Sequence, residues 1–369
     1  MMSDQSQKET IRVGLIAPSG IGKTSIIASL LAEAKTVLSG SPVQIKAVGK
    51  TKKIMNELDQ KLRTHIRGRA FVVGGIPGNE TAVKMELSVG LPDLNEHLYF
   101  EFLDYPGGWL TNPDGASEAD WKKVEDFLIS CDTIILPLDS PLIMEWTTPN
   151  EDLQVSSEIN LEAVQDVIES WCKKRNPDKS MLFLTPVKCE HYLNDNGGRQ
   201  DKSTLLESRC IERTAPLLKS IVEENPQTKV LYCPIDTMGC VQLKRVNFRK
   251  TPPDSRFSIR GKDPQLSRKG AGDIFVYLID HYFSKAEAER AKLQDKLASD
   301  AKDAVNLAQR DEGFFGNIWN YITGEQSRRE LDAESKSGLA QGQAEALKTF
   351  VETLEGIRKL RPSNRLKEL

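Results

Sequence analysis

Residues 11 to 26 constrain the fold of this chain more than any other part of its sequence. They begin with the apolar run 11–17, which predicts a strand, and pass through a small glycine-bearing loop to a helix that opens at Lys23. Small residues in such a loop let backbone N–H groups converge on an anion at the positive end of the helix. The spacing Gly22-Lys23-Thr24 is typical of a phosphate-binding (Walker A) loop, with Ala17 where the first glycine usually stands.

We therefore expect this loop to bind the phosphates of a nucleotide. Lys23 adds a charge for the terminal phosphates, and the Thr24 hydroxyl is placed to hold a magnesium ion. The strand–loop–helix setting argues against a chance glycine-rich turn. The expected nucleotide-binding residues of the loop are Ser19, Gly20, Ile21, Gly22, Lys23, Thr24 and Ser25.

A second motif follows two predicted strands at 81–89 and 97–103. The second of them ends in Asp104-Tyr-Pro-Gly107, an aspartate at a strand end followed by a D-x-x-G turn. Beside a phosphate-binding loop, such a carboxylate can hold magnesium through water, and Gly107 can offer its N–H to the terminal phosphate. Asp-x-Pro-Gly is also good turn chemistry by itself. The upstream loop favours the functional interpretation.

Strands and helices alternate along the rest of residues 11–283, which predicts an α/β fold with a mostly parallel sheet covered on both faces. A loop with Trp146 and two prolines is expected before the helix at 160, and a hairpin insertion at about 241–262. Ligands belong at the carboxyl ends of the strands. The predicted strands are 11–17, 81–89 (an antiparallel neighbour), 97–103, 133–138, 181–187 and 230–235, and the helices are 25–35, 51–66, 117–130, 160–174, 203–224 and 270–283.

Length and composition narrow the class further. The 369 residues suggest one large domain at 11–283, after a disordered stretch 1–10 and before an appendage at 284–369. The net charge of −3 argues against a dedicated nucleic-acid binder. The six cysteines form no C-x-x-C pair and the four histidines have no ligand spacing, so buried thiols and no zinc site are expected. The polar N-terminus and the lack of a long apolar run predict a cytoplasmic protein.

Over residues 11–283 the two motifs resemble those of P-loop GTPases of the translation-factor-related (TRAFAC) class, most closely the bacterial double-GTPase-like proteins. The resemblance implies a P-loop NTPase three-layer sandwich with GTP and Mg²⁺ as ligands. It implies that Thr24, Thr81 and Asp104 hold the metal, with Thr81 closing over the terminal phosphate. Lys23 and Thr81 are then the catalytic candidates.

The base in such proteins is read by an N/T-K-x-D sequence, which corresponds here to Val187-Lys188-Cys189-Glu190. By this resemblance Lys188 lies along the base and Glu190 accepts hydrogen bonds from guanine. The sequence departs from the pattern, because valine replaces the asparagine and glutamate replaces the aspartate. ATP therefore stays an alternative to GTP, and solvated loop charges stay an alternative for Lys188 and Glu190.

Many relatives carry a water-orienting glutamine after the D-x-x-G glycine, but this chain has Gly108 there. We therefore expect a GTP-binding switch with slow, partner-stimulated hydrolysis. Two alternatives stay open. One is an ATPase or small-molecule kinase on the same loop, and the other is a non-hydrolysing, nucleotide-stabilised scaffold that acts through its C-terminal tail.

From residue 284 the composition changes to charged, helix-forming sequence, which predicts helices at 284–310 and 335–361. Between them, residues 313–323 would place five apolar side chains on one helical face. Packing on the domain, on a neighbouring helix or on another subunit is favoured over contact with a membrane surface, because no Lys or Arg lies within the segment. A protein partner or self-association through these helices is expected. The apolar side chains are Phe314, Phe315, Ile318, Trp319 and Ile322.

Overall fold

The computed structural model describes residues 10–40, 43–67, 80–90, 97–111, 115–174, 180–198, 200–282, 356 and 365–369. They form an α/β fold around one mixed, eight-stranded sheet with the order β10-β7-β6-β5-β1-β4-β3-β2. The five central strands, β7 to β4, run parallel, whereas β3, β2 and β10 join by antiparallel pairing. The strands are β1 Thr10–Leu15, β2 Gln44–Ala47, β3 Val83–Gly90, β4 His97–Asp104, β5 Thr133–Asp139, β6 Met181–Val187, β7 Lys229–Tyr232 and β10 Lys367–Glu368.

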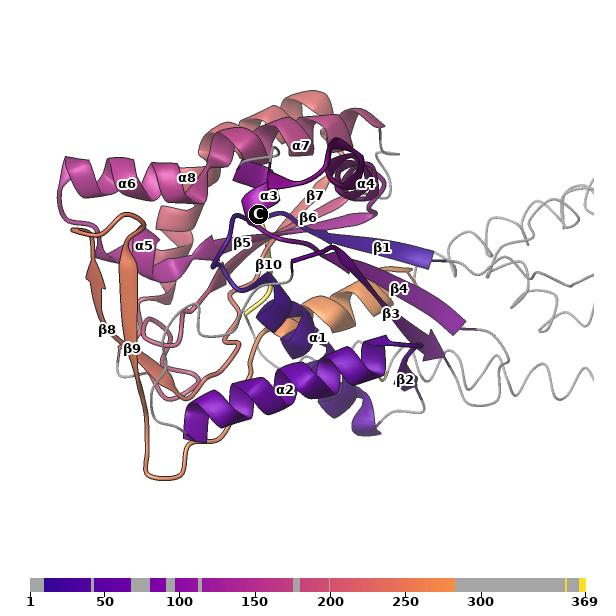
Figure 1. Cartoon of the computed structure of the whole chain (residues 1–369), viewed down its shortest axis with the longest axis horizontal. Coiled ribbons are helices and arrows are strands. Elements are labelled where there is room, and N and C mark those ends of the chain that lie inside the picture. The colour runs from indigo at the N-terminus through magenta and orange to yellow at the C-terminus, as the bar shows by residue number, and fades with distance from the viewer. Residues whose placement is uncertain are drawn as a thin grey trace, which may run out of the picture.

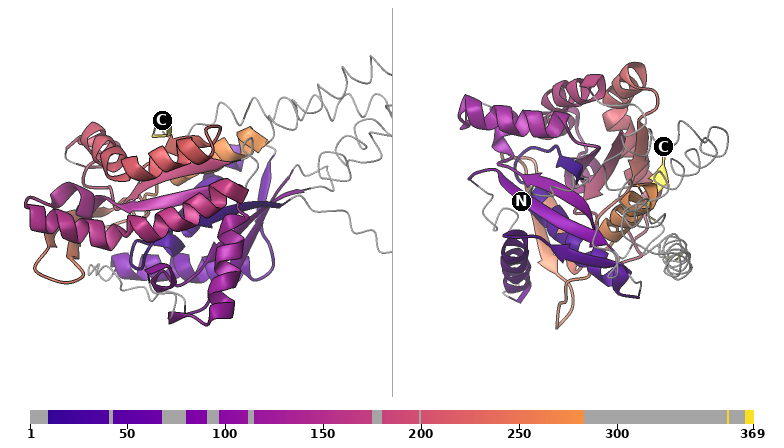
Figure 2. Two further views of the ribbon diagram at one scale, coloured as in Figure 1. Left: turned by 90° about the horizontal axis from the view of Figure 1, so that it is seen from above. Right: turned by 90° about the vertical axis from the view of Figure 1, so that its right-hand side faces the viewer.

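Helices cover both faces of this sheet (Figures 1 and 2). One face packs against α1 and the helix at 271–282, with α2 beside α1, and the other packs against α4, α7 and α8. The helices are α1 Lys23–Val37, α2 Thr51–Arg67, α3 Gly108–Thr111, α4 Glu118–Ile129, α5 Ser140–Glu145, α6 Pro149–Ile159, α7 Leu161–Lys174 and α8 Ser203–Glu224.

The strand sequences explain why the core has two layers. β5 and β6 are buried along their whole length, as expected of parallel strands covered on both faces. Successive side chains of a strand point to opposite faces. Accordingly Phe183 joins the core under α1, and its neighbours Leu182 and Leu184 join the core under α7 and α8. The expectation of a mostly parallel sheet between two helical layers is confirmed.

The segment between β5 and α7 corrects one prediction. Where a proline-containing loop was expected, the chain forms α5 and α6. Both prolines lie in the first turn of a helix, where the missing N–H costs nothing. Asp139 caps α5 by accepting from the N–H of Leu142 at 3.2 Å, and Thr148 forms a capping box with Glu151.

Three further elements concern the edges of the fold. The predicted hairpin is confirmed as β8 Val241–Asn247 and β9 Asp254–Ile259, a separate two-stranded sheet. The short edge strand β2 was not predicted. The helical region expected over 284–369 does not reach its end, because residues 367–368 form β10 on the edge of β7.

Several predictions fall outside the described residues. They concern the first nine residues, most of the loop at 67–80, the helix at 284–310 and the aromatic face at 313–323. Of the helix predicted at 335–361, only Gly356 is described, and it is helical. Among the described helices, none has the length and apolar character that crossing a bilayer requires.

Candidate phosphate-binding site

The loop between β1 and α1 is shaped by two glycines. Gly20 and Gly22 have φ values of 78° and 108°, in the left-handed region that glycine adopts without steric cost. Gly22 is the N-cap of α1 and supplies no side-chain cap. The first N–H groups of a helix have no partner within it, so this end of α1 suits an anion.

Lys23 curls back over this loop. Its side chain is buried, and its Nζ donates to the carbonyl oxygens of Ala17 at 2.8 Å and Pro18 at 3.3 Å. Burial lowers the pKa of Lys23 from 10.5 to about 8, and the nearby carboxylate of Asp104 opposes that shift. The ammonium group lies 5.0 Å from the ring centre of Tyr105. A cation is thus held at the place where phosphates would bind.

Asp104 ends β4, directly beside the end of β1, because these two strands pair in parallel. Its Oδ2 accepts a hydrogen bond of 2.5 Å from the hydroxyl of Thr24. Asp104 as a whole is only 2% exposed. Burial raises its pKa, while the Thr24 hydroxyl and the charge of Lys23 act in the opposite direction.

The Thr24 and Asp104 oxygens fit a magnesium ion. Both are hard oxygen donors, and Mg²⁺ is commonly held by one or two protein oxygens together with phosphate and water. In the described part of the chain, no group of three or more His, Cys, Asp or Glu side chains could form a complete metal cage. A pair of oxygen donors of this kind suits a metal that arrives with a phosphate ligand.

The D-x-x-G turn packs tightly on the phosphate loop. A Cβ on Gly107 would lie 2.6 Å from Lys23 Nζ and 2.6 Å from the backbone nitrogen of Ser19, so only glycine fits. A Cβ on Gly108 would meet nothing within 4 Å. The turn is anchored by Tyr105, whose hydroxyl donates to the carbonyl oxygen of Leu15 at 3.0 Å. Sequence reasoning did not identify this anchor.

Thr81 lies outside the set of contacts described above. It is exposed and lies two residues before Val83, the first residue of β3, which pairs with Asp104. This places Thr81 at the same end of the sheet as the loop. No hydrogen bond joins it to the loop in the described part of the structure.

Lys188 reaches the phosphate loop from the end of β6. Its Nζ donates to the carbonyl oxygen of Gly20 at 3.1 Å and forms an ion pair of 2.6 Å with Asp139. The side chains of Lys188 and Asp139 are 17% and 7% exposed, so neither is a solvated loop charge. Sequence reasoning missed Asp139 as a site residue, although a charged residue ending a fully buried strand was the available signal.

Glu190 turns away from the loop. Its Oε1 accepts from the backbone N–H groups of Met238 at 3.3 Å and Gly239 at 3.2 Å, while its Oε2 is buried without a hydrogen-bond partner. Burial raises its pKa from 4.5 to about 7, and the charge of Asp236 adds to the shift. Glu190 is therefore buried and Lys188 is held in an ion pair, so neither side chain is a solvated loop charge.

Neither a scan of protein-family models nor a search of curated proteins finds a match for this chain. Its function is therefore inferred from the geometry of its own residues.

Proposed function

We propose that this chain is a GTP-binding switch that hydrolyses GTP slowly with magnesium, on a three-layer sandwich of the P-loop NTPase kind. The observation that carries the proposal is the contact between Thr24 and Asp104 beside the buried Lys23. Three groups that a nucleoside triphosphate with its metal requires are thus together at the carboxyl ends of β1 and β4.

The backbone N–H groups from Ser19 to Ser25 and the ammonium of Lys23 would bind the phosphates. Lys23 Nζ donates to two loop carbonyl oxygens, so its charge is held over the loop. Gly107 is close enough to Ser19 and Lys23 to offer its N–H to the terminal phosphate. Movement of its turn would then report whether that phosphate is present.

Thr24 would hold Mg²⁺ directly and Asp104 would hold it through water, with Thr81 as a third candidate. When bound, the ion neutralises charge on the terminal phosphates. Burial raises the pKa of Asp104, and the Thr24 hydroxyl and the charge of Lys23 limit that rise.

Two features support slow turnover and weak discrimination between bases. Gly108 has no side chain with which to orient the attacking water, so a partner would have to complete the site. Lys188 is in place beside the loop, but Glu190 is 2% exposed and already bonded to backbone N–H groups. These observations also favour the second candidate, a nucleotide-stabilised scaffold without hydrolysis.

The test is a titration of labelled GTP and labelled ATP, with and without magnesium. We expect GTP binding that requires magnesium and that weakens about 10-fold to 100-fold in Lys23→Ala, since hydrogen bonds to charged groups contribute about 1.5–3 kcal/mol. Lys35→Ala, an exposed lysine in the last turn of the same helix, is the matched control and should bind as the wild type does.

The outcomes separate the candidates. A preference for ATP would overturn the assignment of the base, and unchanged affinity in Lys23→Ala would overturn the site itself. Turnover by the isolated chain should stay well below about 1 per second, the lower end of ordinary enzymes. GTP binding without phosphate release, even after long incubation, would favour the second candidate, a nucleotide-stabilised scaffold that does not hydrolyse GTP.

A further inference from the structure

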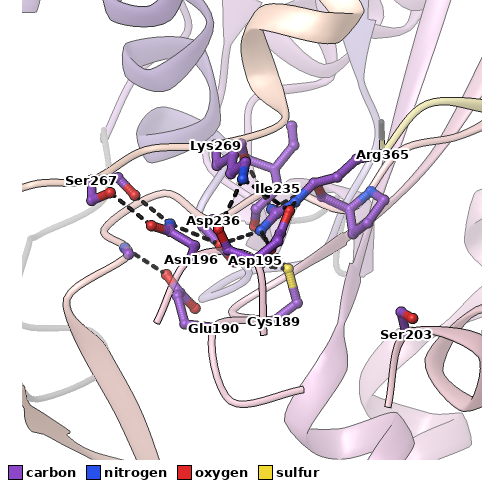
Figure 3. Close-up of polar contacts among 12 residues, drawn as sticks. Cys189, Glu190, Asp195, Asn196, Ser203, Ile235, Asp236, Ser267, Lys269 and Arg365 are labelled. Carbon is purple, nitrogen blue, oxygen red and sulfur yellow. Dashed lines mark hydrogen bonds and ion pairs between the residues drawn. The ribbon is translucent and has the colours of Figure 1, made fainter. Parts of the chain in front are cut away.

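The last residues of the sequence return to the sheet beside the loops that follow β6 and β7. β10 pairs antiparallel with β7, Lys367 opposite Tyr232 and Glu368 opposite Leu231. The N–H of Leu369 also donates to the carbonyl oxygen of Val230 at 3.0 Å. This pairing brings Arg365 to the carboxyl end of β7, where the loops that follow β6 and β7 meet (Figure 3).

Arg365 is buried, with 6% of its surface exposed, and its guanidinium is fully bonded. Nε and NH2 form a bidentate pair with Asp195 at 2.9 and 2.5 Å, and NH2 also donates to Asp236 at 2.6 Å. NH1 donates to the carbonyl oxygens of Pro234 at 3.3 Å and Lys269 at 3.1 Å. All five N–H groups of a guanidinium therefore have an acceptor, which is how a buried charge is compensated.

Asp236 contacts both Arg365 and Cys189, the residue next to Lys188. It is 0% exposed, and its Oδ1 lies 3.1 Å from the thiol of Cys189. Burial raises the pKa of Cys189, so the thiol stays a donor. Cys189 directly follows Lys188, whose Nζ donates to the carbonyl oxygen of Gly20. Contiguous contacts thus run from the end of the chain to the phosphate loop.

Two local features show that this region depends on the surrounding contacts. Lys188 has a φ of 58°, a left-handed conformation that a lysine keeps only where the surroundings hold it. Three carboxyl groups also converge here, since Glu190 interacts with Asp236 and Arg365 binds both Asp236 and Asp195. Without the guanidinium, the buried Asp236 would lack its cation and the loops after β6 and β7 would repel one another.

We propose that Arg365 is a positioning residue for the base-side half of the site, and that docking of residues 365–369 and nucleotide binding stabilise each other. This inference rests on the proposed function. Arg365 acts through Asp236 and Cys189 on Lys188, which in the proposed function lies along the base, so Arg365 affects the part of the ligand that lies beyond the phosphates. By thermodynamic linkage, if docking of residues 365–369 strengthens nucleotide binding by some factor, bound nucleotide must strengthen the docking of these residues by the same factor.

The test compares two ligands that share phosphates but differ in the base: GTP and inorganic tripolyphosphate, each with magnesium. In Arg365→Gln we expect GTP affinity to fall tenfold or more. Tripolyphosphate affinity should stay within about twofold of the wild type, because the phosphate half is built from β1, α1 and β4, and Lys188 meets it at the carbonyl oxygen of Gly20 rather than at a phosphate-binding N–H. Lys367→Ala is the matched control. It removes a half-exposed charge from the same tail, one that is paired with Glu207, and should bind both ligands normally.

A second measurement uses the unmodified chain, and so does not depend on the variant folding. Hydrogen exchange at the amides of Lys367 to Leu369 should slow at least tenfold when GTP saturates the site, but not when tripolyphosphate does.

Each outcome has one meaning. Equal loss of both ligands in Arg365→Gln, or unchanged GTP affinity in a folded variant, would overturn the positioning role and leave the proposed function standing. If hydrogen exchange at the amides of residues 367–369 is the same with and without GTP, the coupling is overturned. Failure of the wild type to bind either ligand would overturn the proposed function instead.

Discussion

The hydroxyl of Thr24 donates to Asp104 at 2.5 Å, although the two residues are 80 positions apart in the sequence. Thr24 lies in the first turn of α1 and Asp104 is the last residue of β4, and the parallel pairing of β1 with β4 brings them together. Two oxygen donors thereby meet beside Lys23, an arrangement that would suit a phosphate-bound magnesium ion.

Removal of the Thr24 hydroxyl should abolish the magnesium dependence of nucleotide binding. We expect Thr24→Ala to bind GTP at least tenfold more weakly in magnesium, and to bind about as well with magnesium as without it, because one metal ligand is lost. Thr24→Ser keeps the hydroxyl and is the matched control. Magnesium titrations with labelled GTP test this prediction, and a Thr24→Ala variant that keeps its full magnesium response would contradict the proposed metal site.

The adjacent glycines of the D-x-x-G turn should respond differently to alanine. Gly107→Ala forces a Cβ to 2.6 Å from both Lys23 Nζ and the Ser19 backbone, so the turn must move. Overpacking of this kind costs about 1–3 kcal/mol, and GTP affinity should fall with it. Gly108→Ala has open space around its Cβ and should leave stability unchanged. Urea unfolding with GTP titration measures both, and equal stability losses in the two variants would refute the tight packing.

The ion pair between Lys188 and Asp139 should show coupling in a double-mutant cycle. Lys188→Met leaves a carboxylate that is only 7% exposed without its cation, so we expect a loss of about 2 kcal/mol or more. Asp139→Asn keeps an acceptor for the N–H of Leu142 and should cost less. The double variant should recover about 1 kcal/mol relative to the sum of the single changes, whereas additive free energies of unfolding would mean that the pair contributes nothing.

Glu33 on α1 should make stability depend on pH. Its Oε2 accepts from the N–H of Gly272 at 2.5 Å and its Oε1 is buried without a partner. Burial is the main cause that raises its pKa from 4.5 to about 7. The folded state therefore binds more protons between these values, and the contribution of this group to stability is lost as pH rises through about 7.

We expect this group to lower the free energy of unfolding between pH 5 and pH 8 by at most about 3 kcal/mol. Glu33→Gln keeps an acceptor for Gly272 and does not titrate. Its stability relative to the wild type should rise from pH 5 to pH 8 in urea unfolding. Parallel pH profiles for the two proteins would show that Glu33 is not protonated in the folded state.

Much of the fold was predictable because its pattern is local. The strand Met181–Val187 and the helix Ser203–Glu224 were predicted with these same bounds, since a continuous apolar run and a long amphipathic run each define one element. The helices α5 and α6 were missed because Pro141 and Pro149 were interpreted as loop formers. In a sequence, a proline in a loop cannot be told from a proline in the first turn of a helix. Here the capping contacts of Asp139 and Thr148, which only the structure shows, identify both prolines as first-turn residues.

By itself, the sequence determined the phosphate half of the candidate site, because one short loop contains most of its groups in consecutive positions. The tertiary structure alone decided the rest. It paired Lys188 with Asp139, turned Glu190 into the interior, and brought Arg365 to Asp195 and Asp236. These contacts join residues far apart in the chain, and their charges are stable in the interior only once strand pairing has placed a partner beside each.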